Sequence, residues 1–387
     1  MSGVSHDGEV RRETPMAAKL KALIRQSGPI TVADYMRACL SDREHGYYVT
    51  RQAIGRNADF ITAPEISQVF GELIGLWSGV VWQLMGRPGS VNLVEIGPGR
   101  GTLMADALRA ARIVPGFLNA ATVHLIESSD VLRRTQETVL AGAPAAISWH
   151  RDIASALGRG ATIPDGPTIV VANEFLDTQP VSQFVFHEGN WHERAVGLDA
   201  EGRLTFTMLE APDDSFEPTL GADYVAKDGD ILERNSDMTY LGYAILMSLA
   251  EVAPFAALFI DYGHARSGVG DTLQAVSEHR YVSPLFAPGE TDLTTQVDFE
   301  LFETIASSPG RIAIDGPVTQ AEFLGRLGIM ERASKLMSAN PGLANEIEVG
   351  VARLMAVPGM GDRFKAIGIR SAGLSPLPGF PPPRSSP

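Results

Sequence analysis

A glycine-rich segment at residues 95–102 has residue types and spacing suited to binding a nucleotide-type cofactor. It reads EIGPGRGT, completes the apolar run NLVEI, precedes a helical pattern and contains Gly97, Gly99 and Gly101. Glycines at a strand-to-helix turn let the backbone approach a ligand, which then meets the N–H groups of the helix. A nicotinamide-binding turn reads GxGxxG and needs Gly or Ala where this chain has Thr102. The acidic Glu95 could instead hold the amino group of a methionine-derived cofactor, and a tight structural turn is the alternative.

A second candidate cofactor residue, Glu127, ends the apolar run TVHLIE. A carboxylate at the end of the second strand can accept hydrogen bonds from both ribose hydroxyls of a nucleoside, as in doubly wound dinucleotide sites. Taken alone, a glutamate at a strand end is more often a solvated cap. Its position one βα unit after the glycine-rich turn favours the cofactor role.

Polar residues follow the fourth apolar run, TIVVA, in the segment ANEFLD. Asn173, Glu174 and Asp177 would lie at the carboxyl edge of a parallel sheet, where ligands bind in open α/β folds. Burying such groups without partners is costly, so we expect them to contact water, one another or a substrate. Glu174 and Asp177 could bind a cation or accept a proton. Alternatively, Asn173 caps a helix whose first turn carries Asp177.

The segment DFITAPEIS, residues 59–67, precedes the first of these apolar runs and reads as the start of a helix. Thr62 suits the N-cap, Pro64 the first helical position and Glu65 the acidic first turn. The pattern predicts one helix from near Pro64 through Leu84. From local physics alone, a structural role is the simpler interpretation of this segment.

Short apolar runs alternate with amphipathic helical patterns from residue 91 onward, which is typical of a parallel sheet covered by helices on both faces. The runs are NLVEI (92–96), TVHLIE (122–127), AISW (146–149), TIVVA (168–172) and ALFID (257–261). Between the last two, residues 180–237 alternate apolar and polar positions and predict inserted antiparallel hairpins. We expect helices over residues 15–40, and one more strand (311–315) followed by terminal helices. The segment DYG, which begins at Asp261, is expected to form a wall of the cleft.

Composition excludes several functional classes. The 387 residues carry a net charge of −14, which disfavours a nucleic-acid partner and suits a cationic one. Cys39 is the single cysteine, so no intrachain disulfide can form. No metal site is predicted, because His150, His192 and His279 lack ligand spacing and HExxH is absent. No stretch suits a membrane span, and the acidic N-terminus resembles neither a signal peptide nor a transit sequence, which together predict a cytoplasmic protein.

Eight motifs in this order resemble the MidA-like family, formerly a domain of unknown function, which is similar to the mitochondrial protein arginine methyltransferases that assist complex I assembly. They span residues 59–329 and read DFITAPEISQVFGELIG, LVEIGPGRGTLMADALRA, HLIESSDVLRRTQ, ANEFLDTQPV, WHERAV, FIDYG, GETDLTTQVDF and QAEFLGRLGI. The resemblance implies a class I, Rossmann-like α/β methyltransferase that uses S-adenosylmethionine. It also implies a protein substrate bearing arginine, as with the 49-kDa subunit of NADH dehydrogenase in the mitochondrial relative.

Matching positions between this chain and the family motifs imply the site residues, and we also predict domain boundaries. The cofactor would contact Glu95, the glycine-rich turn, the acid Glu127 and the TAPE segment, which includes Thr62 and Pro64. Transfer chemistry would involve Asn173, Glu174, Asp177 and, as third candidate base, Glu65. We expect a helical extension (1–90), the cofactor domain (91–180 and 238–374), a β-rich substrate segment (181–237) and a proline-rich tail (375–387).

Two other functions stay open at this stage. One is a small-molecule methyltransferase of the same fold, with the inserted segment closing over a metabolite. The other is a non-catalytic assembly chaperone that retains the cofactor cleft. The sequence does not decide the acceptor, the number of methyl groups transferred or the oligomeric state.

Overall fold

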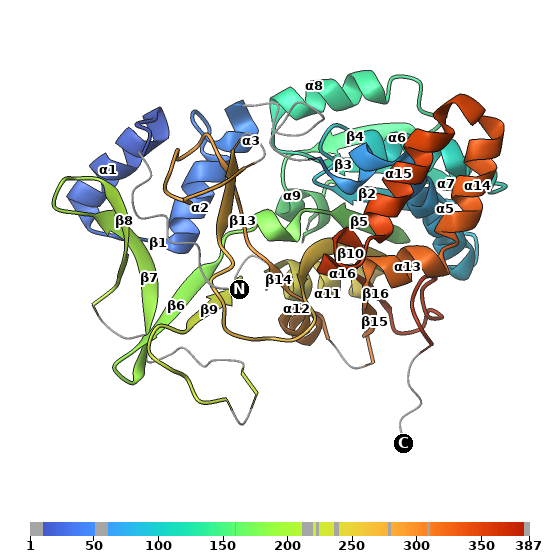
Figure 1. Ribbon diagram of the computed structural model, residues 1–387. Helices are drawn as coiled ribbons and strands as arrows, with labels where there is room; N and C mark the ends of the chain where they lie inside the picture. Colours follow the sequence, from blue (N-terminus) through green and yellow to red (C-terminus); the bar gives the residue numbers. More distant parts are fainter. Residues whose placement is uncertain are drawn as a thin grey trace.

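A computed structural model describes residues 11–50, 61–158, 160–210, 220–221, 224–235, 240–277, 280–307 and 310–382. Asp59, Phe60 and His279, as well as parts of the expected substrate segment and of the tail, lie outside these ranges. The chain forms two lobes (Figure 1). A large mixed sheet with its helices makes one lobe, and α1 to α3 with smaller sheets make the other.

The large sheet has the order β15-β16-β10-β5-β2-β3-β4. Five parallel strands form its centre and one side: β2 (Val91–Ile96), β3 (Ala121–Ile126), β4 (Ala146–His150), β5 (Thr168–Asn173) and β10 (Phe255–His264). Strand β2 has neighbours on both sides that lie later in the chain, so the strand order reverses there. In open α/β sheets, such a reversal leaves a crevice at the carboxyl ends of the strands.

Apolar side chains alternate between the two faces of this sheet, and helices cover both. Leu93 on β2 packs in one core, with α5 (Gln68–Leu84), α6 (Thr102–Ala111), α14 (Ile329–Ala339) and α15 (Ala344–Met355). The adjacent Val94 packs in the other, with α9 (Ile153–Leu157), α11 (Leu246–Val252) and α12 (Phe299–Ala306). The predicted α/β class with a covered sheet is therefore confirmed.

Two local predictions are wrong. The expected single helix from Pro64 to Leu84 is divided at Ser67 into α4 (Ala63–Ile66) and α5, because Ser67 is extended and its Oγ accepts a hydrogen bond from Val69 N–H. The region after residue 315 is not only helical, since β16 (Phe364–Ser371) enters the sheet. It runs antiparallel to both β10 and β15 (Ile312–Thr319), which are its neighbours.

The second lobe is built around a five-stranded sheet that joins distant parts of the chain. Its members are β1 (Ile30–Thr31), β6 (Ser182–His187), β7 (Asn190–Leu198), β8 (Leu204–Met208) and β9 (Ile231–Arg234). Helices α1 (Pro15–Ser27) and α2 (Val32–Ser41) share a core with it. A small sheet of β11 (Gln274–Ser277), β12 (Arg280–Val282) and β13 (Asp292–Thr294) contributes to the same core.

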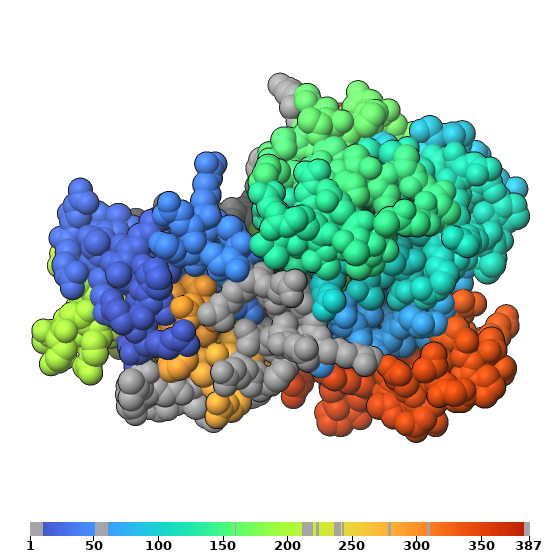
Figure 2. All heavy atoms as spheres, turned by 90° about the horizontal axis from the view of Figure 1, so that it is seen from above, coloured from blue at the N-terminus to red at the C-terminus, as the bar shows by residue number. Residues whose placement is uncertain are grey.

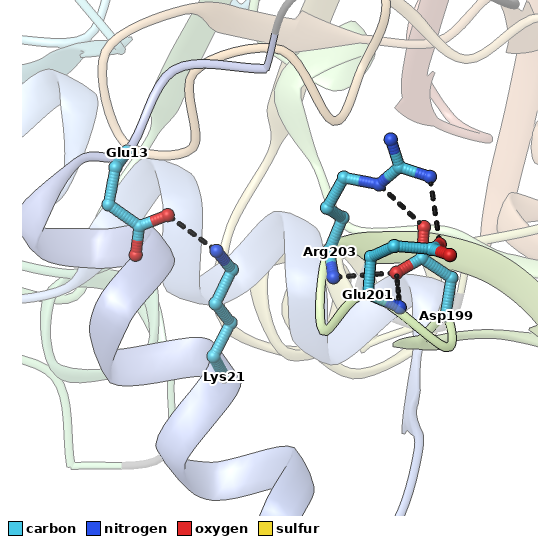
Figure 3. A network of polar contacts seen from close by, with 5 residues as sticks. All are labelled: Glu13, Lys21, Asp199, Glu201 and Arg203. Atoms are coloured by element: carbon cyan, nitrogen blue, oxygen red, sulfur yellow. Dashed lines mark hydrogen bonds and ion pairs between the residues drawn. The ribbon is translucent and has the colours of Figure 1, made fainter.

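Exposed ion pairs occur on this lobe (Figure 3). The Nζ of Lys21 on α1 donates to the Glu13 carboxylate. At the turn between β7 and β8, Asp199 accepts from the Arg203 Nε at 2.8 Å and from the Arg203 backbone N–H at 2.7 Å. Exposed pairs of this kind contribute little to stability.

Seen from above, the N-terminal helices and the surface that includes α8 (Asp130–Val139) form separate masses, and the molecule narrows between them (Figure 2). Short α3 (Tyr47–Thr50) lies on the side of the N-terminal lobe that faces α8. No helix within the described ranges combines the length and the apolar character that a membrane crossing requires.

The helix that precedes β2 packs very closely on the helix that follows it. A Cβ placed on Gly75 of α5 would lie 2.2 Å from the carbonyl oxygen of Ala107 on α6. We therefore expect Gly75→Ala to lower the free energy of unfolding by about 1–3 kcal/mol, the usual range for overpacking. Urea unfolding measures the change. Gly89→Ala is the control, since a Cβ there meets no heavy atom within 4 Å. Equal losses for both variants would contradict this account of the packing.

Candidate functional site

A cleft with an empty volume of about 380 Å³, partly open to solvent, lies at the carboxyl ends of β2 and β5. Three separate segments form it: the short helix α4, the turn between β2 and α6, and the residues that end β5. Its lining residues are Thr62, Pro64, Glu65, Glu95, Gly97, Pro98, Gly99, Arg100, Thr102, Leu103, Asn173 and Glu174. The structure therefore brings together most residues that the sequence singled out.

The glycine-rich turn has the backbone that only glycine adopts easily. The φ angles of Gly97, Gly99 and Gly101 are 65°, 53° and 85°, all in the left-handed region. At Gly97, a Cβ would also lie 3.1 Å from Cδ2 of Phe175, which leaves little room for a side chain. The turn thus exposes backbone to the cleft directly before the first N–H groups of α6.

Glu95 is a buried carboxyl group facing this turn. It is 2% exposed, and its Oε2 has no hydrogen-bond partner among the described residues. Burial, with a smaller contribution from nearby Glu127, raises the pKa of Glu95 to about 8. A buried acceptor without a partner is costly, so this oxygen is suited to a ligand that brings a hydrogen-bond donor or a positive charge.

Glu127 follows β3 and is held from two directions. Its Oε1 accepts a hydrogen bond from Ser129 N–H at 2.7 Å, and its Oε2 accepts one from the side-chain amide of Gln136 at 3.1 Å. Burial raises the pKa of Glu127 to about 7, although these two bonds and one from the backbone of Ser128 oppose the shift. Glu127 is not one of the residues that line the cleft described above, but it lies close enough to Glu95 to raise its pKa.

Asn173 and Glu174 end β5 on the opposite side of the cleft. Glu174 has a φ of 52°, which is unusual for a residue with a side chain. Its Oε1 accepts hydrogen bonds from Ala63 N–H at 2.8 Å and from the Asn173 amide at 3.1 Å. The Asn173 Oδ1 then has no partner among the described residues. Burial raises the pKa of Glu174 to about 7, so this group can exchange a proton near neutral pH.

Asp177 is separated from the lining of the cleft. It lies in the short 3₁₀ turn Leu176–Thr178 and is 4% exposed, and burial raises its pKa above the usual range. The turn is held by Asp261, whose Oδ2 accepts the N–H groups of Phe175, Leu176 and Asp177 at 2.8–3.2 Å. Asp261 was expected to form a wall of the cleft. It is fully buried beneath the turn instead, because three backbone donors converge on it.

The TAPE segment connects the two halves of the cleft. Thr102, at the start of α6, donates its hydroxyl to Glu65 Oε1, and the N–H of Ala63 donates to Glu174. Thr62 occupies the N-cap of α4 but makes no side-chain capping bond, and Pro64 lies in the first turn. The segment therefore starts a helix, as local physics predicts, and also lines the cleft.

Sequence reasoning missed Gln136 on α8. This side chain is fully buried and contacts both the glycine-rich turn and Glu127. A signal did exist: Gln136 lies four residues after buried Leu132 and four before buried Leu140, so it occupies the apolar face of its helix. A polar residue on such a face needs a specific partner.

The chain is similar in sequence to known methyltransferases. A family described as "Putative S-adenosyl-L-methionine-dependent methyltransferase" matches residues 73–318. Protein arginine methyltransferase NDUFAF7, mitochondrial, from Rattus norvegicus is 34% identical, with 94% of this chain and 86% of the relative covered. The Homo sapiens protein of that name is 35% identical, covering 91% of this chain and 82% of its own. The chain belongs to this methyltransferase family.

Solved structures support the same fold. An uncharacterized protein from Burkholderia thailandensis has a TM-score of 0.79 and 25% identity, over 96% of this chain and 97% of its own. A second structure from that organism, bound to S-adenosyl-homocysteine, has a TM-score of 0.77 and 24% identity, over 96% and 97% of the chains. The family membership confirms the predicted use of S-adenosylmethionine and the methyltransferase activity.

The predicted cytoplasmic localisation is wrong by the same comparisons. The relatives from rat and human are both named as mitochondrial proteins. The acidic character of the first residues was therefore a poor guide to localisation. In the described ranges, no group of three or more His, Cys, Asp or Glu side chains is arranged to hold a metal ion.

The raised pKa of Glu95 gives a testable dependence of stability on pH. Its pKa rises from an ordinary 4.5 to about 8 in the folded chain, so folding favours the protonated form. The protonated Glu95 therefore stabilises the folded state near pH 4.5, and this stabilisation is lost as the pH rises through about 8. We therefore expect Glu95→Gln to unfold at higher urea concentration than the parent at pH 8.5, and the two to converge toward pH 5. A difference that is the same at both pH values would contradict the assignment.

Proposed function

We propose that this chain transfers methyl groups from S-adenosylmethionine to arginine side chains of a protein. The observation that carries the proposal is the pair of buried, unpartnered acceptor atoms at the cleft, Glu95 Oε2 and Asn173 Oδ1. They lie on the two strand ends that flank the crevice, next to a turn of left-handed glycines. Acceptors in this position suit a cationic ligand that also carries N–H donors.

The residues present fit the cofactor. Glu95 would hold its ammonium group, Glu127 its ribose hydroxyls, and the turn of Gly97, Gly99 and Gly101 would let its middle part approach the backbone. Thr62 and Pro64 would form the wall that α4 presents. When bound, S-adenosylmethionine supplies a methyl group on a positively charged sulfur.

The acids on the other side of the cleft suit a guanidinium acceptor. A guanidinium is planar, strongly basic and a poor nucleophile, so carboxylates must localise its charge and receive the proton that the attacking nitrogen loses. Glu174 is the main candidate because it lines the cleft and its pKa is near 7. Glu65 also lines the cleft, whereas Asp177 would act from beneath through the negative charge that it places near Glu174. Asn173 would fix the orientation of the Glu174 carboxyl group.

The acceptor class rests on the named relatives. Proteins 34% and 35% identical over most of this chain are named protein arginine methyltransferases. The net charge of −14 is compatible with a partner that presents arginine. We further propose residues 1–90 as a helical extension whose α5 packs on the cofactor domain, and 181–237 as the segment that contacts the substrate protein. The cofactor domain would comprise residues 91–180 and 238–374, of which β11 to β13 pack in the other lobe, with a proline-rich tail at 375–387.

Glu174→Gln tests the assignment of the base. The amide keeps an oxygen to accept from Ala63 N–H, so we expect S-adenosylhomocysteine affinity and melting temperature to stay nearly unchanged. Methyl transfer should fall by roughly 100-fold or more, the scale of a lost general base. In the parent protein, the rate should rise with pH through about 7, because the base must lose its proton, and the variant should lack this step.

Glu303→Gln is the matched control for this experiment. Glu303 on α12 is another glutamate whose pKa is raised by burial, but it does not line the cleft. Its replacement should leave the transfer rate unchanged. A Glu174→Gln variant that binds S-adenosylhomocysteine and retains the full rate would exclude Glu174 as the base and favour Glu65 or Asp177.

The acceptor itself can be identified directly. The chain is incubated with labelled S-adenosylmethionine and an extract lacking this protein, or with a purified 49-kDa-type subunit of NADH dehydrogenase. Mass spectrometry then locates the label, which we expect on arginine. Label on a small molecule would instead support a metabolite methyltransferase, and cofactor binding with no labelled product would support a chaperone.

A further inference from the structure

Gln136 on α8 joins the two parts of the candidate cofactor site. Its Nε2 donates to the carbonyl oxygen of Gly99 at 2.7 Å and to Glu127 Oε2 at 3.1 Å. The side chain is 0% exposed, so it meets no solvent. It also lies against the turn, since a Cβ on Gly101 would be 3.4 Å from Gln136 Cγ. One buried amide therefore contacts the glycine-rich turn and the acid at the end of the next strand.

The orientation of this amide is fixed by its third partner. Trp149 on β4 donates its indole N–H to Gln136 Oε1 at 3.0 Å. An indole N–H can only donate, so the amide oxygen must face Trp149 and the NH₂ group must face Gly99 and Glu127. Both of those partners are acceptors, so the reversed amide would place oxygen against oxygen twice. The network has one consistent arrangement.

Building on the proposed function, we propose that Gln136 is a positioning residue that holds the Glu127 carboxylate for the ribose hydroxyls of the cofactor. The Gln136 amide donates one hydrogen bond to Glu127 Oε2, and the N–H of Ser129 donates one to Glu127 Oε1 at 2.7 Å. Each carboxylate oxygen can accept a further hydrogen bond. These protein donors thus fix the plane of the carboxyl group, whose oxygens can accept further hydrogen bonds from the ribose hydroxyls.

The two bonds of Gln136 also link the turn to the acid. Gly99 belongs to the segment before α6 and Glu127 to the segment after β3, and Gln136 bonds to both. The glycine-rich turn and Glu127 would then already have the right separation before a ligand binds to both. Preorganisation of this kind raises affinity because less order has to be created on binding.

The test compares two ligands: S-adenosylhomocysteine and its analogue without the 2′ and 3′ ribose hydroxyls. We expect the parent protein to prefer the hydroxyl-bearing ligand by about 10-fold or more, as two hydrogen bonds to a carboxylate imply. Gln136→Met keeps the volume but removes the amide. It should reduce that preference to less than about threefold, mainly by weakening the hydroxyl-bearing ligand. Calorimetry measures both dissociation constants.

Two further variants keep the test decisive. Trp149→Phe keeps an aromatic ring at this position but removes the indole N–H that orients the amide, so it should lower the preference even if Gln136→Met does not fold. Thr138→Ala, on the same helix, changes a hydroxyl that bonds to the Arg134 carbonyl and should leave the preference unchanged.

The outcomes separate this inference from the function on which it rests. If the parent protein binds both ligands equally, Glu127 does not hold the ribose, and the proposed placement of the cofactor fails together with the role of Gln136. If the parent discriminates and folded Gln136→Met and Trp149→Phe discriminate equally well, Gln136 is merely structural and only this inference is overturned. Equal weakening of both ligands by Gln136→Met would lead to the same conclusion.

Discussion

The site depends on the burial of several carboxyl groups at one edge of a sheet. Glu95, Glu127 and Glu174 have pKa values raised to about 8, 7 and 7, in each case mainly because burial disfavours the charged form. Such groups reduce stability at neutral pH unless a ligand brings donors or positive charge. We propose that their grouping beside a turn of left-handed glycines prepares the site for a cationic ligand with hydroxyl and ammonium donors.

The rest of the fold keeps these groups in place. Strand β2, which carries Glu95, lies between β3 and β5, so the strand order reverses there. Helix α15 then supports the far wall of the cleft: a Cβ on Gly350 would lie 2.8 Å from the carbonyl oxygen of Ile66, so α15 packs directly on the end of α4. Segments from both ends of the chain thus stabilise a site that the central strands provide.

The sequence predicts the central parts of this account and misses those that depend on distant partners. The glycine spacing and five apolar runs are local patterns, and the strands form where those runs occur. Strand β16 was missed because its pairing with β10 and β15 depends on residues far apart in the chain. Glu174 and Asp177 look equivalent in the motif ANEFLD, but only the structure distinguishes the one that lines the cleft from the one beneath it. The role of Gln136 likewise required the positions of Gly99 and Glu127.

The number of protons released when S-adenosylhomocysteine binds tests the central claim most directly. Calorimetry at pH 7 in two buffers with different ionisation enthalpies measures this number. If the ligand's ammonium and hydroxyl groups meet Glu95 and Glu127, both carboxyl groups become more acidic, and about one proton is released to the buffer. A binding enthalpy that is the same in both buffers would mean that no proton is exchanged. That result would contradict the claim that these buried acids hold the cofactor.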